Sequence, residues 1–185
     1  MLKLKVKKKV RSAKDKRLAL RDRLWPEVED AQLWLRKERV GFTTIPRTMN
    51  LIGRVMDQLG GKGFPLFNTY LALWCRVYDE GIVEIRSDRE LAFESGFGGP
   101  RGEITWRARM RLLKEIGFID VRAGLASEMQ YVLIYNPILV IVDLYEKDNL
   151  KEDMAFSALL ARLSEVGAND LDYVDEDPSE DDDEL

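Results

Sequence analysis

The segment 87–133 constrains the fold of this chain most strongly, because its order of breaks and apolar runs fits few arrangements. Ser87 and Glu90 have the spacing of a capping box, so a helix is expected to begin near residue 88. That helix must end before the glycine- and proline-rich run Gly96-Phe97-Gly98-Gly99-Pro100. A second helix is predicted from Glu103 to Ile116, where a glycine follows as a C-terminal signal.

The predicted second helix has an apolar side and a basic side. At about 100° per residue, three apolar side chains share one side and are expected to face inward: Trp106, Met110 and Leu113. The basic stripe consists of Arg107, Arg111 and Lys114. We expect these basic side chains to be hydrated.

Two short apolar runs, 118–122 and 129–133, follow the second helix and are rich in β-branched and aromatic residues. Such runs are typical of strands, and the polar connection 123–128 predicts a hairpin. Before residue 87, the sequence predicts a buried helix over 64–78 and a short strand over 82–86. Trp74 and Cys75 in that helix are expected to be core residues, since both residue types are usually buried.

This order of elements, with the pattern LxxxGFI at Leu113, Gly117, Phe118 and Ile119, resembles the winged helix-turn-helix superfamily of DNA-binding domains. The resemblance covers about residues 66–136 and implies that the helix 103–116 enters the major groove of double-stranded DNA. It implies base reading by Arg107 and Arg111, contacts of Thr105 and Arg101 with bases or phosphates, and backbone contacts of Lys114 and Arg122.

Two features depart from that superfamily. The turn 96–102 is longer and richer in glycine than usual. Ile104, Ala108 and Leu112 also add apolar surface to the face expected to meet DNA. These features leave the docking register open and would accommodate a partner protein on that face.

The composition excludes several other classes of function. The chain has no histidine, which rules out histidine-containing catalytic triads and histidine-ligated metals. No pair of carboxylates sits at a strand-to-helix junction, and the Gly98-Gly99 turn lacks a dinucleotide-binding frame. We therefore expect no catalytic residue, no metal site and no cofactor, and a protein that is not an enzyme. A single cysteine and the absence of a long apolar run favour a cytoplasmic protein without a membrane span, associated with the nucleoid if it binds DNA.

Charge is distributed unevenly along the chain. Residues 1–23 carry a net charge of +9, and residues 165–185 carry −11. The basic arm includes Lys7, Lys8 and Lys9, which would add affinity for phosphates without sequence preference. A solvated tail is an equal alternative, and the alternation of apolar residues with lysine also fits a strand. The acidic end is too charged to be buried and is expected to be disordered. It either keeps the protein soluble or competes with DNA for the basic face.

Helices are also predicted over 26–40, 46–59, 138–145 and 151–166, with a strand as the alternative for 138–145. The run Gly60-Gly61-Lys62-Gly63 ends the second of these and lacks the glycine and hydroxyl positions of a phosphate-binding loop. The resemblance implies that helices outside the winged domain, N-terminal or C-terminal, form a homodimer, and an intramolecular cover over the core is an equal alternative for the C-terminal helices.

Taken together, the sequence predicts a mainly α protein with a small β-hairpin wing and extra N- and C-terminal helices. The expected parts are a basic flexible arm (1–23), an N-terminal helical extension (24–63), the winged helix-turn-helix domain (64–136), C-terminal helices (137–166) and a disordered acidic tail (167–185). The expected function is double-stranded DNA binding, with transcription regulation favoured. The alternatives are a plasmid- or phage-type replication protein and a non-enzymatic protein-protein adaptor.

Overall fold

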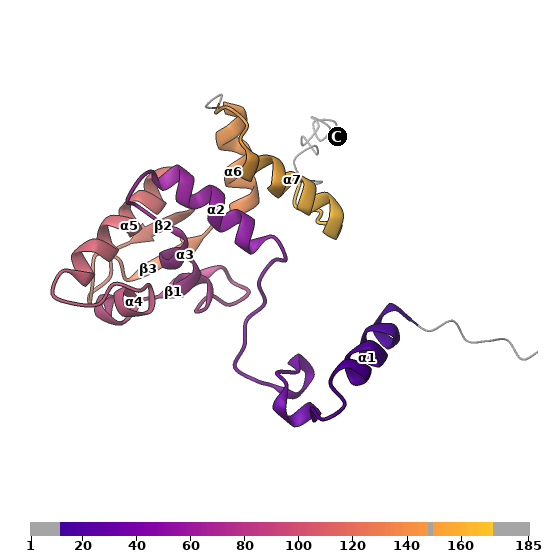
Figure 1. Cartoon of the computed structure of the whole chain (residues 1–185). Coiled ribbons are helices and arrows are strands. Elements are labelled where there is room, and N and C mark those ends of the chain that lie inside the picture. Colours follow the sequence, from indigo (N-terminus) through magenta and orange to yellow (C-terminus); the bar gives the residue numbers. More distant parts are fainter. Residues whose placement is uncertain (1–11, 148–149, 172–185) are drawn as a thin grey trace, which may run out of the picture. The chain divides into compact units, whose positions relative to one another are not determined.

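The computed structural model describes residues 12–147 and 150–171, apart from the side chain of Glu38. The chain divides into two units, residues 1–42 and residues 43–185, and each is described by itself. Lys7, Lys8 and Lys9 of the basic arm lie outside the described residues, as does most of the acidic tail. Figure 1 labels the helices and strands.

The first unit contains the helix α1 (Ala13–Leu24), so the second half of the predicted basic arm is helical. A complete capping box begins α1: the Ser12 hydroxyl accepts from the Asp15 backbone N–H at 3.1 Å, and the Asp15 carboxylate accepts from the Ser12 N–H at 3.0 Å. None of its side chains is buried. Its helix-forming residues and this cap, rather than packing, account for the helix.

The prediction of a continuous helix over residues 26–40 is wrong. Only two single 3-10 turns form there, Asp30–Gln32 and Arg36–Glu38. On the apolar side of the expected helix, Trp34 is 64% exposed and Leu33 and Leu35 are only partly buried, so that side does not pack into a core. A short helix needs such packing, because propensity alone leaves it marginal in water.

The second unit is mainly helical and has a small three-stranded antiparallel sheet. Its helices are α2 (Met49–Gly60), α3 (Phe67–Trp74), α4 (Asp88–Glu94), α5 (Gly102–Ile116), α6 (Pro137–Lys147) and α7 (Met154–Val166). Its strands are β1 (Ile82–Glu84), β2 (Ile119–Arg122) and β3 (Tyr131–Ile134). The predicted pair of helices followed by a hairpin is confirmed, and so is the helix at 138–145 rather than a strand.

The sheet has the order β1-β3-β2, with the last strand in the middle. Val132 of β3 lies opposite Val83 on one side and opposite Val121 on the other. Side chains alternate between the faces of a strand, so these valines share the inner face. The outer face carries exposed Ile82 and Leu133.

The core lies between the sheet and the helices. Helix α5 contacts α3, α4 and β2, while α2 contacts α3, α6 and α7 (Figure 1). The largest fully buried side chains of this core include Trp106, Tyr70, Phe118, Ile52 and Leu113. The apolar side predicted for α5 is therefore confirmed as the buried side, which leaves the opposite side to solvent.

Two local signals position α4 and α5. The Ser87 hydroxyl accepts from the Glu90 backbone N–H at 3.3 Å, and α4 begins at the next residue. Helix α5 ends at Ile116, and the C-cap residue Gly117 has a φ of 101°, a left-handed conformation that glycine adopts without strain. Cys75 is exposed, contrary to the prediction, because α3 ends at Trp74 and the chain turns to the surface.

Candidate nucleic-acid interface

Five of the nine residues that the sequence selected for DNA contact lie on α5 or at its N-cap. Arg101 lies at the N-cap of the helix, and Arg111 lies about three turns further on. Both are exposed, and within the described part of the chain neither guanidinium has a hydrogen-bond or ion-pair partner. The Thr105 hydroxyl donates to the Arg101 carbonyl at 3.0 Å. Arg101 and Arg111 are thus available to bind an anion.

Arg107 is engaged within the fold. Its Nε and Nη2 atoms donate to Oδ2 of Asp88 at 2.8 and 2.7 Å. The Asp88 side chain is only 7% exposed, and the hydroxyl of Ser127 donates to its Oδ1 at 3.0 Å. Asp88 therefore joins the beginning of α4, the middle of α5 and the β2–β3 connection. Arg107 therefore differs from Arg111: Arg107 is paired with Asp88, whereas Arg111 has no partner among the described residues.

Lys114 and Arg122 lie together because both pair with Asp120. The Lys114 Nζ atom is 2.9 Å from Oδ1 of Asp120, and the Arg122 Nη2 atom is 3.0 Å from Oδ2. The Lys114 ammonium also donates to the Val121 carbonyl at 3.0 Å. The hydrogen bond from Lys114, followed by that from the Val121 backbone N–H, holds the pKa of Asp120 below its ordinary value. Arg122 keeps 77% of its side chain exposed.

Arg109 has a structural role that the sequence reasoning missed. It is 6% exposed and donates to the carbonyl groups of Pro65 at 3.1 Å and Gly63 at 3.0 Å. Its guanidinium lies over the Phe64 ring, 4.1 Å from the ring centroid. Burial lowers its pKa from the ordinary arginine value. The signal was available, because residue 109 lies about 60° from Trp106 on a helical wheel.

Arg86 after β1 and Arg89 in α4 are also exposed, and both were among the cations not selected from the sequence. Neither has a partner within residues 12–147 and 150–171. Arg89 lines a shallow hollow together with Pro100 and Glu103, at the turn between α4 and α5. Its position two residues after Ser87, within the predicted first helix, could have suggested exposure, but the sequence does not indicate that Arg89 lies near Pro100 and Glu103.

Apolar side chains are also exposed on α4, on α5 and in the β2–β3 connection. Phe93 of α4 is 74% exposed and Ile104 of α5 is 67% exposed. Leu125 lies in the β2–β3 connection and is fully exposed. Ala108 and Leu112 are only partly exposed, so Ile104 accounts for most of the apolar surface expected on α5.

The described residues contain no group of three acidic or cysteine side chains suited to a metal ion. Within the same ranges, no helix has both the length and the apolar composition that a membrane span requires. No known protein family, curated protein or solved structure matches this chain.

Proposed function

We propose that the second unit is a winged helix-turn-helix domain that binds double-stranded DNA, with α5 in the major groove. The observation that carries the proposal is the exposed side of α5, where Arg101 and Arg111 have no partner among the described residues. The element order α3, β1, α4, α5, β2, β3 and the sheet order β1-β3-β2 also support it. An α-helix fits the major groove, and arginine can bind a guanine edge through two hydrogen bonds.

The contacts divide between bases and phosphates in this proposal. Arg111 reads a base, while Arg101 and the Thr105 segment contact bases or phosphates near the start of α5. Arg107 keeps its bond to Asp88 and contacts DNA through its exposed edge, since 43% of its side chain remains accessible. Lys114 and Arg122 contact the backbone, where a phosphate would compete with Asp120 for both cations. Lys7, Lys8 and Lys9 add affinity without sequence preference.

Transcription regulation is the cellular role we propose, with plasmid or phage replication as the alternative use of the same domain. Both roles need a protein that distinguishes one duplex sequence from others. A bidentate arginine–guanine contact contributes about 1–3 kcal/mol of discrimination. Sequence selectivity is therefore the property to test first.

The test is selection of bound sequences from random duplex DNA. Wild type is compared with the double variant Arg101→Ala/Arg111→Ala and with the control Arg47→Ala/Arg54→Ala, which removes two exposed arginines near and within α2. We expect an enriched motif for wild type and the control, and its loss for the α5 variant. Equal retention of DNA by all three proteins without a motif would contradict groove reading.

A protein-protein adaptor is the second candidate function, because Phe93 and Ile104 are exposed apolar residues on α4 and α5. An exposed apolar patch is typical of a protein-binding surface. If wild type retains no duplex DNA at low salt, the adaptor becomes the better account of this face.

A further inference from the structure

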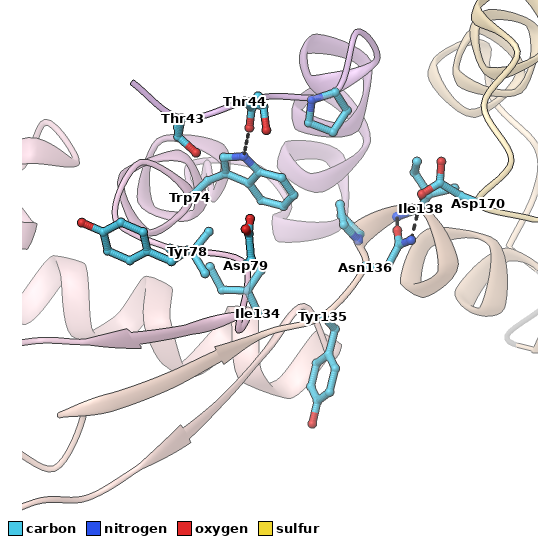
Figure 2. A pocket seen from close by; sticks show the side chains of 14 residues that line it. Thr43, Thr44, Trp74, Tyr78, Asp79, Ile134, Tyr135, Asn136, Ile138 and Asp170 are labelled. Carbon is cyan, nitrogen blue, oxygen red and sulfur yellow. Dashed lines mark hydrogen bonds between the residues drawn. The ribbon is translucent and has the colours of Figure 1, made fainter. Parts of the chain in front are cut away.

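A hollow of about 280 Å³ lies in the second unit, separate from the basic side of α5. Its walls come from the segment before α2, the end of α3, the turn before β1, the β3–α6 junction and the residues after α7. Figure 2 shows its lining side chains, with Asp79 close to Trp74 and with Asn136 beside Asp170. The rings of Tyr78 and Tyr135 point away from the centre.

Hydrogen bonds within the chain hold the walls in place. The Trp74 indole Nε1 donates to the Thr44 carbonyl at 2.9 Å. The Asn136 Nδ2 atom donates to Oδ1 of Asp170 at 2.9 Å, and the Asn136 Oδ1 atom accepts from the Ile138 N–H at 2.9 Å. These bonds hold the walls in a defined arrangement, which reduces the cost of ordering on binding.

The hollow is acidic. Asp79 and Asp170 line it, and no lysine or arginine does. Asp79 has no hydrogen-bond or ion-pair partner in the described part of the chain. Asp170 uses one carboxylate oxygen for Asn136 and leaves the other without a bond to a described residue. A ligand would therefore meet negative charge and vacant hydrogen-bond acceptors.

The remaining walls are apolar and aromatic. Trp74 contributes part of its indole, and Pro46, Val77 and Ile134 contribute aliphatic surface. Because the described residues offer no set of three ligands for a metal, a divalent ion is a poor fit. An organic cation fits better, since a carboxylate pairs with its charge while the indole and the aliphatic walls cover its body.

We infer that this hollow binds a small organic cation, an amine or guanidinium with a short aliphatic chain. The charged end lies at the Asp79 carboxylate and the aliphatic part lies along Trp74, Val77 and Ile134. The same chemistry is found in a free metabolite-sized amine and in an arginine or lysine side chain of another polypeptide. This inference is independent of DNA binding.

The probe is butylguanidinium, and butylurea is its neutral counterpart of nearly the same shape. Both are titrated into the full chain while the Trp74 indole N–H is followed by nuclear magnetic resonance and assigned with Trp74→Phe. We expect saturable shifts for butylguanidinium with a Kd on the order of 1 mM, as suits a ligand this small. The affinity for butylurea should be at least about tenfold weaker.

Asp79→Asn tests the position of the charge, and Glu115→Gln removes an exposed carboxylate from α5 as the matched control. We expect Asp79→Asn to weaken butylguanidinium binding about tenfold and Glu115→Gln to leave it unchanged. The inference is overturned if butylguanidinium and butylurea bind equally, or if Asp79→Asn binds butylguanidinium as tightly as Glu115→Gln does. It is also overturned if folded wild type shows no saturable shift.

Titration of Nα-acetylarginine methylamide separates the two sources of the cation. Binding comparable to butylguanidinium assigns the hollow to a side chain of a polypeptide. Binding of butylguanidinium alone assigns it to a free organic cation, because the backbone of the blocked arginine is then excluded.

Discussion

Asp88 should contribute measurably to folding stability, because it joins three segments that are distant in the sequence. Its carboxylate accepts from Arg107 Nε at 2.8 Å, from Arg107 Nη2 at 2.7 Å and from the Ser127 hydroxyl at 3.0 Å. It also lies in the first turn of α4, where negative charge is favourable. The substitution Asp88→Ala removes all of these interactions without altering the apolar core.

The expected loss follows from these contacts. Hydrogen bonds to charged groups contribute roughly 1.5–3 kcal/mol each, and a carboxylate in the first helical turn adds about 0.3–1 kcal/mol. Arg107 is 43% exposed and can be rehydrated, which reduces the total. We therefore expect Asp88→Ala to lower the free energy of unfolding by about 2–3 kcal/mol.

Urea denaturation followed by circular dichroism measures this loss. With a typical slope of about 1–3 kcal/mol per molar, the unfolding midpoint should fall by on the order of 1–2 M. Glu115→Ala, which removes an exposed carboxylate from α5, is the matched control and should change little. A double-mutant cycle with Arg107→Gln should give a coupling of about 1 kcal/mol. A loss below about 0.5 kcal/mol, as for ordinary surface substitutions, would refute the role given to Asp88.

Three further predictions concern packing and ionisation. Gly53→Ala should destabilise by about 1–3 kcal/mol, because its added Cβ would lie 2.5 Å from the Phe67 ring; a higher melting temperature would contradict this close approach. Burial, and then the hydrogen bond to Asp153, raises the pKa of Tyr145 to about 12, so its stabilising contribution is complete below the ordinary value of 10.0 and is lost as pH rises through 12. An ultraviolet titration in which every tyrosine ionises near the ordinary value would exclude that shift. The lowered pKa of Asp120 gives a stabilising contribution that is present above pH 3.8 and is lost as pH falls through the depressed pKa. Lys114→Met should raise the pKa of Asp120, as measured by titration of its carboxyl resonance. An unchanged pKa would contradict the cause assigned to the shift.

Much of the second unit could be predicted from its sequence, because its local signals are strong. Ser87 predicts the beginning of α4, Gly117 predicts the end of α5, and the apolar period predicts which side of α5 is buried. The same apolar period gave a wrong helix prediction over residues 26–40, because an amphipathic segment forms a stable helix only where another surface covers its apolar side. Helix α1 could have been predicted from its helix-forming residues together with the capping box of Ser12 and Asp15.

The candidate interface was only partly predictable. Helical periodicity indicates which cations of α5 are exposed, but it does not indicate which partners they find. Arg107 pairs with a carboxylate 19 residues earlier in the chain, and Lys114 pairs with Asp120 in the next strand. These contacts depend on how α4, α5 and the hairpin pack together. The sequence alone therefore could not predict that Arg101 and Arg111 are cations without a partner in the described part of the chain.

Residue-by-residue mapping of duplex binding tests the central claim most directly. Backbone amide resonances of the full chain are followed while a duplex obtained by selection is added. We predict the largest perturbations over residues 101–111 and in the β2–β3 connection, with little change in α6. Perturbations confined to the first unit, or centred on α6 and α7, would contradict the claim that the solvent-facing side of α5 meets DNA.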